Sequence, residues 1–338
     1  MRKVTGVPVR VALAMTAVVA LLTGCVAGED SGSDTPDGTG VALRLDYAYW
    51  NPESLVLRDQ KWLETELADK RVSVTWQLSA GSNKANENLR AAVIDIGSTA
   101  GVAALVARAN GSPIKTVEVF SQPEWAAIVV AKNSPIASVA QLKGRKIAAT
   151  KGTDPYFFLL QALDQAGLKP SDVTVVNLQH ADGKTALERG DVDAWAGLDP
   201  HMAQSQVDAG SKLIYRNLDF NTYGVLNARE DFIAAHPELV QAVVNAYERA
   251  RAWLTEHPDQ AVELLARESK VSAEVARVVL AERTRLAVDP VPGAAQRQVF
   301  ERVLPILVAD GNVRSADEAR TALDSLLEPR FAQDRAKP

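Results

Sequence analysis

The stretch that decides the fold is residues 146–200, KIAATKGTDPYFFLLQALDQAGLKPSDVTVVNLQHADGKTALERGDVDAWAGLDP. Short apolar runs alternate in it with amphipathic runs, and Gly or Asx-Pro marks the boundaries. Strands that alternate with helices form parallel sheets that are covered on both faces. The pattern predicts strand, helix, strand, helix and strand over Lys146–Thr150, Asp154–Gly167, Val173–Leu178, Asp182–Arg189 and Asp193–Ala196.

The same alternation extends on both sides of this stretch, and only helix patterns follow Arg229. We therefore expect an α/β protein with two lobes, each a mostly parallel sheet flanked by helices. Residues 41–130 and 221–330 would form lobe 1, and residues 131–220 would form lobe 2. The chain would cross between the lobes twice, which is the arrangement of a hinge. Strand patterns outside the central stretch cover residues 43–49, 72–76, 94–96, 114–119, 125–130, 213–215 and 222–226.

The first 24 residues have the composition of a secretion signal. Three positive charges precede an apolar run over Val11–Leu22, which is too short to span a bilayer but has the length of a signal-peptide core. The run ends in Leu22-Thr23-Gly24-Cys25, which resembles a bacterial lipobox, so Cys25 is the predicted lipidation site. Residues 25–40 are rich in Gly, Ser and Asp and would be a flexible tether. The alternative is an ordinary signal peptide with an incidental cysteine.

Composition excludes several classes of function. The 338 residues carry a formal net charge of −5, which gives the chain no general electrostatic affinity for nucleic acid. With Cys25 as the single cysteine, an internal disulfide and a cysteine-built zinc or iron–sulfur site are impossible. The four histidines show no metal-ligand spacing. We expect no metal and no cofactor.

Four probable strand-to-helix junctions share one chemistry. Ligands of parallel α/β sheets bind beyond the carboxyl ends of strands, and helix N-termini there offer unpaired N–H donors to an anion. A cleft among these junctions is therefore the predicted binding site, although an Asx-Pro pair is also ordinary helix capping. The junctions are Asn51-Pro52, Ser98-Thr99, Asp154-Pro155 and Asp199-Pro200.

Aromatic side chains near these junctions would supply flat pocket walls with a polar edge. Buried tryptophans are also common in cores, so each could be structural. Asp154 and Asp199 argue against a pure anion site, because a carboxylate at a helix start occupies the N–H donors and repels an anion. One of them could pair with a ligand amine or point away. The aromatic candidates are Tyr49, Trp50, Trp125, Tyr156, Trp195 and Tyr223.

Catalysis gains little support from the sequence. In Gly97-Ser98-Thr99-Ala100-Gly101 the central residue is threonine, whereas a nucleophile elbow requires serine there. The chain also has no GxxxxGK[ST] phosphate loop and no GxGxxG fingerprint. The sequence therefore favours a binding protein over an enzyme.

Several motifs resemble those of the periplasmic-type binding proteins for alkanesulfonates, taurine and nitrate. The resemblance extends from about Tyr47 to His257 and is specific for the family more than for the ligand. Ala92, Leu198 and the segment Asn86–Asn88 depart from the family pattern, which leaves the ligand open. The matching stretches are Ser134-Pro135-Ile136, Leu142–Ala148, Lys151-Gly152-Thr153, Glu188–Trp195 with Asp199-Pro200, and Leu89–Gly97.

The resemblance implies a type II periplasmic-binding-protein fold and a monomeric, lipid-anchored, extracytoplasmic solute-binding protein of an ABC importer. Its partners would be a small sulfonate-like ligand, the membrane permease and the membrane itself. An aliphatic sulfonate is the first expectation, with taurine, nitrate or a thiamine pyrimidine precursor as alternatives. The family's ligand loops map onto Tyr49–Asn51, Ser98-Thr99, the run Gly152, Thr153, Asp154 and Tyr156, and Trp195–Asp199.

Two other classes remain as alternatives. The fold resembles that of an aryl sulfinate desulfinase and a thiamine pyrimidine synthase, which use an active-site cysteine. Here the single cysteine lies at the lipidation position, which closes that route. An adhesion or sensor lipoprotein is compatible with the lipobox but would need no ligand cleft.

Overall fold

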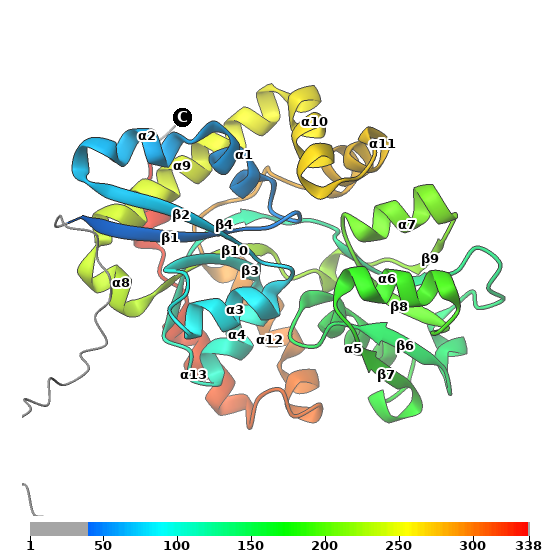
Figure 1. Ribbon diagram of the computed structural model, residues 1–338. Helices are drawn as coiled ribbons and strands as arrows, with labels where there is room; N and C mark the ends of the chain where they lie inside the picture. Colours follow the sequence, from blue (N-terminus) through cyan, green and yellow to red (C-terminus); the bar gives the residue numbers. More distant parts are fainter. Residues whose placement is uncertain (1–39, 337–338) are drawn as a thin grey trace, which may run out of the picture. The chain divides into compact units, whose positions relative to one another are not determined.

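The computed structural model describes residues 40–336 (Figure 1). Two five-stranded sheets organise this part of the chain, and we call the parts built on them lobe 1 and lobe 2. The strands are β1 Val41–Tyr47, β2 Val72–Leu78, β3 Ile96–Ala100, β4 Ile114–Ser121, β5 Ala126–Val130, β6 Lys146–Ala149, β7 Thr174–Asn177, β8 Ala194–Leu198, β9 Lys212–Tyr215 and β10 Gly224–Arg229.

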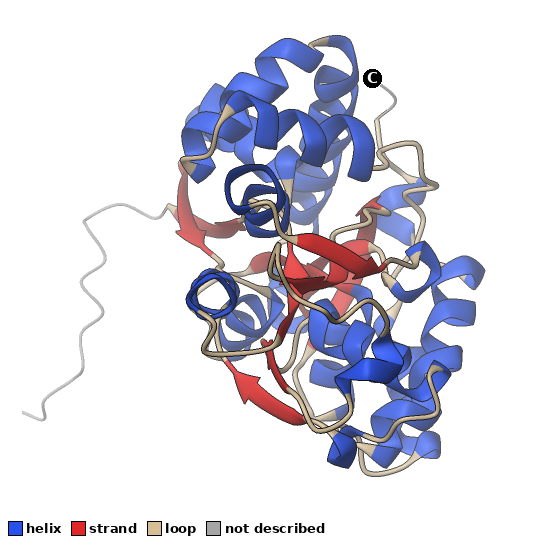
Figure 2. Ribbon diagram, turned by 90° about the vertical axis from the view of Figure 1, so that its right-hand side faces the viewer, coloured by secondary structure: helices blue, strands red, loops and turns tan. Residues whose placement is uncertain are grey.

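Helices connect and cover these strands (Figure 2). The α-helices are α1 Pro52–Gln60, α2 Trp62–Leu67, α3 Ser82–Arg90, α4 Gly101–Ala109, α5 Asp154–Gln165, α6 His180–Arg189, α7 His201–Ala209, α8 Glu230–Ala235, α9 Pro237–Glu256, α10 Pro258–Ser269, α11 Ala273–Arg277, α12 Ala294–Ala309, α13 Ala316–Leu326 and α14 Arg330–Gln333. The 3-10 helices are η1 Ala68–Lys70, η2 Val139–Leu142, η3 Pro170–Asp172 and η4 Leu218–Phe220, and η5 Val278–Arg283 is a π-helix.

The two sheets have the same plan. In lobe 1 the strand order is β2-β1-β3-β10-β4, and in lobe 2 it is β7-β6-β8-β5-β9. β1 pairs in parallel with β2 and β3, and β6 pairs in parallel with β7 and β8. β10 and β5 run antiparallel to both of their neighbours. Each antiparallel strand is the one that directly follows a crossover from the other lobe, so the expected pair of mostly parallel sheets is present.

One predicted boundary needs correction. The prediction placed residues 125–130 at the end of lobe 1, but β5 pairs with β8 and β9 of lobe 2. The crossover therefore occupies residues 122–125. All five residues of β5 are buried. A continuously apolar strand matches the interior of either sheet, so its composition could not assign it to one lobe.

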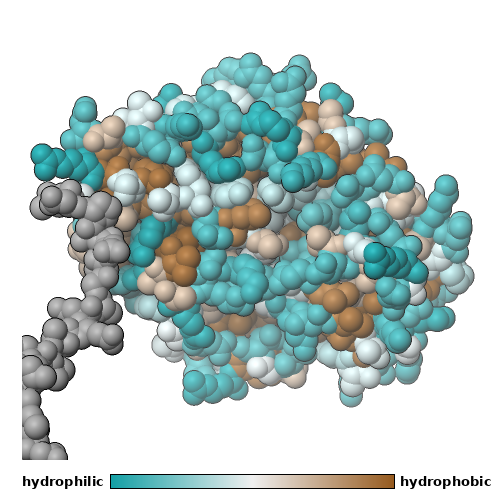
Figure 3. Space-filling model, viewed as in Figure 1, coloured by the Kyte–Doolittle hydropathy of each residue, from teal (hydrophilic) through white to brown (hydrophobic). Residues whose placement is uncertain are grey.

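Burial of apolar side chains explains the layers. One large core cluster extends through both lobes, and a smaller one in lobe 2 contains Trp195, Leu187 and Met202 from β8, α6 and α7. The face seen in Figure 3 is mostly hydrophilic, with separate small apolar patches. Among the described residues, Val93 is the one large apolar side chain that is more than a third exposed.

A third segment lies beside the first crossover between the lobes. Backbone N–H groups of Val119, Gln122 and Glu124 donate to carbonyls of Pro290, Arg285 and Arg283 at 2.8–2.9 Å. The second crossover, residues 221–223, leads back into β10. Two crossovers therefore join the lobes, and one further segment runs beside the first of them.

The predicted signal peptide and the lipidation site Cys25 lie outside the described residues, as does the tether except for Gly40. Within residues 40–336, no helix has both the length and the apolar character needed to cross a membrane.

Candidate binding site

Four loops enclose a pocket of about 210 Å³ between the lobes. Lobe 1 contributes the β1–α1 loop and the β2–α3 loop, and lobe 2 contributes the start of α6 and the β8–α7 loop. These loops follow the carboxyl ends of strands, where ligands of parallel sheets bind. The lining residues are Tyr49, Trp50, Leu78, Ser79, Ala80, Gln179, His180, Ala181, Leu198, Asp199, Pro200 and His201.

Four polar atoms of the pocket residues are buried and have no hydrogen-bond partner among residues 40–336. They are Nε1 of Trp50, Oγ of Ser79, Oε1 of Gln179 and Nε2 of His180. A buried polar group without a partner costs about 1–3 kcal/mol, which a ligand that pairs with it would recover. Their gathering around one pocket indicates a polar ligand.

Two helices begin at this pocket without a side-chain cap on their first N–H groups. α3 starts after Gly81 in lobe 1, and α6 starts after Gln179 in lobe 2. Uncapped helix N-termini carry unpaired N–H donors and a partial positive charge. Both starts therefore favour a negatively charged group in the pocket.

Gly81 brings these two starts close together. A side chain at Gly81 would place its Cβ 2.9 Å from Nε2 of His180 and 2.9 Å from Oδ1 of Asn83. Its φ of 172° is extended backbone, which any residue can adopt. Glycine is required here for space, because any larger residue would collide with the wall of the opposite lobe.

No lysine or arginine lines the pocket. Burial lowers the pKa of His180 to about 3, and it also lowers the pKa of His201. At neutral pH His180 is therefore uncharged. An anion would have to be held by neutral donors and helix N-termini.

The carboxyl group of the pocket, Asp199, is already paired. Its carboxylate contacts Nη1 of Arg283 at 3.0 and 3.1 Å and accepts from the backbone N–H of Ala203 at 2.9 Å. Burial raises the pKa of Asp199, and Arg283 opposes that shift. The carboxylate caps α7 and ties it to η5, so it is not free to bind a ligand amine.

The predicted junction residues of lobe 1 form hydrogen bonds with other groups of the protein. Asn51 caps α1 by accepting from the N–H of Ser54 at 3.2 Å, and it donates to the hydroxyl of Tyr247 at 3.0 Å. Ser98 and Thr99 belong to β3 and do not start a helix. Ser98 bonds to the buried carboxyl of Asp46, and Thr99 accepts from Asn227 at 2.8 Å.

Asp154 and Trp125 meet at the crossovers and not at the pocket. The Asp154 carboxylate accepts from Nε1 of Trp125 at 2.8 Å, from the N–H of Thr222 at 2.8 Å and from its hydroxyl at 2.6 Å. Thr222 in turn accepts from the N–H of Val102 at the start of α4. Asp154 is thus the carboxylate that points away, and it joins α5 to both crossovers.

The other predicted site residues lie outside the pocket too. Trp195 is buried in the smaller core against α6, and the Tyr156 hydroxyl donates to Asp310 at 2.6 Å. Gly152 lines a separate groove with Asn83. The remaining two are Thr153, which bonds to the carbonyl of Thr150, and Tyr223, which has φ 63° in the second crossover. Of the predicted residues, Tyr49, Trp50 and Asp199 line the pocket.

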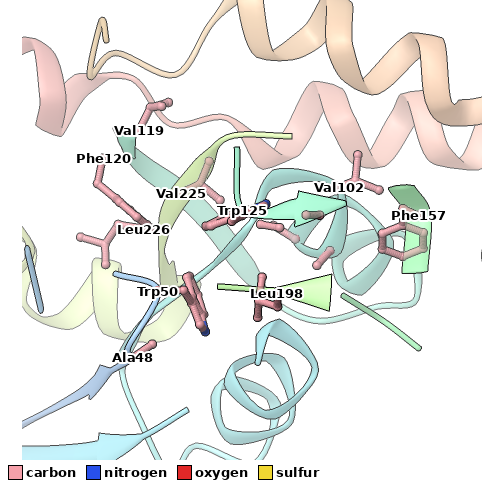
Figure 4. Close-up of a cluster of buried hydrophobic side chains, with 14 of the residues drawn as sticks. Ala48, Trp50, Val102, Val119, Phe120, Trp125, Phe157, Leu198, Val225 and Leu226 are labelled. Carbon is pink, nitrogen blue, oxygen red and sulfur yellow. The ribbon is translucent and has the colours of Figure 1, made fainter. Parts of the chain in front are cut away.

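Figure 4 shows how aromatic packing positions Trp50. Its ring meets Trp125 edge-on at 5.4 Å between centroids and lies near Leu198 of lobe 2. The apolar contacts fix the ring, while its N–H stays without a partner among the described residues. Trp50 therefore presents one oriented donor to the pocket.

The sequence patterns do not indicate the polar side chains at the starts of α3 and α6 as binding residues. Residues 82–90, SNKANENLR, contain only two apolar residues, Ala85 and Leu89, which is a weak helix pattern. α6 begins at His180 and not at the predicted Asp182, so Gln179 and His180 were assigned to a loop. Their position directly after the β7 pattern was the one available indication.

Comparison with known proteins identifies relatives over most of the chain. A family model described as NMT1/THI5 like matches residues 67–261. A protein of Escherichia coli (strain K12) named as an aliphatic sulfonates-binding protein is 31% identical over 286 residues, which cover 82% of this chain and 85% of the relative. A protein of the same name from Bacillus subtilis (strain 168) is 29% identical and covers 75% of this chain and 76% of its own.

Solved structures share the fold. The alkanesulfonate-binding protein SsuA from Xanthomonas axonopodis pv. citri, bound to MOPS, superposes with a TM-score of 0.74 at 25% identity and covers 82% of this chain and 97% of its own. The desulfurization enzyme DszB has a TM-score of 0.59 at 15% identity, with 84% of this chain and 99% of its own covered. The fold thus occurs in both binding proteins and an enzyme.

Proposed function

Because this chain belongs to the NMT1/THI5-like family, we propose that it is the extracytoplasmic solute-binding protein of an ABC importer and captures a small organic sulfonate. The ligand would bind between the lobes and then pass to a membrane permease. The observation that carries the proposal is the interlobe pocket, where buried polar atoms converge without partners.

The chemistry of the pocket suits a sulfonate. Its three equivalent oxygens need hydrogen-bond donors, and Trp50 and the N-termini of α3 and α6 would supply them. A volume of about 210 Å³ is smaller than the ~300–1,000 Å³ of sites for drug-sized ligands, which favours a small solute. The lobes would close when the ligand contacts both walls, because those contacts stabilise only the closed state.

Isothermal titration calorimetry with Trp50→Phe tests the proposal. This change keeps the aromatic ring and removes one N–H donor. A hydrogen bond to a charged group contributes about 1.5–3 kcal/mol, so the affinity for propane-1-sulfonate should fall roughly 10- to 100-fold.

Trp76→Phe is the matched control. The Trp76 N–H donates to Glu64 at 2.8 Å, and neither residue lines the pocket. The affinity of the Trp76→Phe variant for propane-1-sulfonate should equal that of the wild type. Equal weakening in both variants, or no sulfonate binding by the wild type, would refute the proposed site.

Taurine, nitrate and thiamine pyrimidine precursors are the competing ligands. A thermal-shift panel separates them, because a ligand that binds only the folded state raises the melting temperature by mass action. The largest shift should come from a sulfonate, a class that includes taurine, and not from nitrate or a pyrimidine precursor. A shift from a pyrimidine precursor alone would keep the transport role and change the ligand.

We further propose that the protein binds its ligand without making or breaking a covalent bond in it. The relatives named above as sulfonate-binding proteins support this, and the single cysteine of the sequence, Cys25, is not among the residues that the structure describes. Recovery of an unchanged ligand after prolonged incubation would support the proposal, and a converted product would refute it.

Anchoring through a lipid on Cys25 is part of the same proposal. The lipobox-like sequence before Cys25 supports it. Cys25→Ala should move the protein from the membrane fraction to the soluble fraction, and retention of that variant in membranes would contradict the lipid anchor.

A further inference from the structure

The unpaired ring nitrogen of His180 indicates a second property of the ligand. Oγ1 of Thr150 lies 2.6 Å from the carbonyl of Leu178 and 3.2 Å from Nδ1 of His180. A hydroxyl has one hydrogen, and the carbonyl can only accept. The hydroxyl therefore donates to Leu178 and accepts from His180, which places the ring hydrogen on Nδ1.

The other ring nitrogen is then a bare acceptor. Burial keeps the imidazole of His180 neutral, and a neutral ring with its hydrogen on Nδ1 has a lone pair on Nε2. That atom is buried, belongs to a residue that lines the pocket and has no partner among residues 40–336. The pocket thus combines donors on the wall of lobe 1 with an acceptor on the wall of lobe 2.

Resting on the proposed function, we propose that Nε2 of His180 selects a sulfonate that also carries a hydroxyl or amino group. A sulfonate oxygen facing this lone pair would be repelled, because both atoms are acceptors. A ligand O–H or N–H would satisfy it. Gly81 leaves space beside this nitrogen, since a Cβ there would lie 2.9 Å from it.

Two ligands of nearly equal size test this inference. In 2-hydroxyethanesulfonate a hydroxyl replaces the terminal methyl of propane-1-sulfonate. Leaving a buried acceptor unpaired is costly, so the wild type should bind the hydroxylated ligand roughly 5- to 100-fold more tightly by calorimetry. His180→Phe keeps a planar ring without the lone pair and should abolish that preference.

Thr150→Val tests the origin of the lone pair. Without the Thr150 hydroxyl, Nδ1 loses its partner and the ring hydrogen can move to Nε2. The preference should then fall or reverse. The ¹⁵N shifts of the His180 ring in the ligand-free wild type give an independent readout that also holds if a variant fails to fold. They should show the hydrogen on Nδ1.

The outcomes are distinct. Equal binding of the two sulfonates, a preference that survives in His180→Phe, or a ring hydrogen on Nε2 would overturn the inference and leave the proposed function intact. If neither sulfonate binds, both fail.

Discussion

At the scale of single residues, the most unusual group outside the pocket is a buried acidic cluster beneath α1. Both carboxyl oxygens of Glu53 are buried without a partner in the described part of the chain. Nη2 of Arg251 lies 3.5 Å from Oε1 of Glu118 and 3.0 Å from Oε1 of Glu248, so one guanidinium pairs with both carboxylates. Burial raises the pKa of Glu53 to about 7 and the pKa of Glu118 well above its ordinary value.

The raised pKa of Glu53 predicts a pH-dependent stability. The folded state holds the proton more tightly than the unfolded state, whose glutamate titrates near the ordinary 4.5. The stabilisation is complete below pH 4.5 and is lost as the pH rises through about 7. Glu53→Gln cannot ionise and therefore does not suffer this loss. The change in the free energy of unfolding that it causes should be about 1–3 kcal/mol more favourable at pH 8 than at pH 4.

Urea unfolding at both pH values measures the effect. Glu66→Gln is the control, because Glu66 is an exposed residue of α2. It should change the free energy of unfolding equally at the two pH values. A Glu53→Gln effect that is the same at pH 4 and pH 8 would contradict the prediction.

At the scale of elements, α5 depends on Asp154 for its attachment to both crossovers. Burial raises the pKa of Asp154 to about 6, while the bonds from Thr222 and Trp125 oppose the shift. Asp154→Asn replaces one acceptor oxygen by an amide that must face these donors. We expect it to lower the free energy of unfolding by about 1–3 kcal/mol, as measured by urea denaturation at pH 8.

Asp164→Asn is the matched control for this change. Asp164 lies on the same helix and is exposed, so its replacement should change stability by less than about 0.5 kcal/mol. Equal effects of the two variants would show that the contacts of Asp154 do not hold α5.

The elements also show where sequence patterns suffice. Apolar alternation and Asx-Pro starts predicted both sheets and helices such as α1 and α5. Two of the four predicted junctions, the β1–α1 and β8–α7 loops, border the pocket, but a strong N-cap such as Asn51 satisfies its own N–H groups. α3 and α6 are binding candidates because they lack such a cap, and an absent cap leaves no mark in the sequence.

At the scale of the whole molecule, the ion pair of Arg283 with Asp199 joins the two lobes beside the pocket. Both side chains are almost fully buried. Breaking such a pair from one side leaves a buried charge, which costs about 3–5 kcal/mol. We therefore expect Arg283→Gln to destabilise the protein by that amount in urea unfolding.

A double-mutant cycle checks the cause. Asp199→Asn combined with Arg283→Gln should recover most of the loss, because no charge is then left unpaired. The exposed neighbour Arg285→Gln should be close to neutral. Strictly additive effects of the two changes would contradict a role for the pair.

The segment that accompanies the first crossover has a mechanical consequence. Its bonds to Val119, Gln122 and Glu124 make that side of the junction two chains thick, and residues 221–223 add a third strip. Three strips side by side resist torsion more than a single strip does. We therefore expect the lobes to rotate about one axis. Their facing walls would then return to the same alignment at each closure.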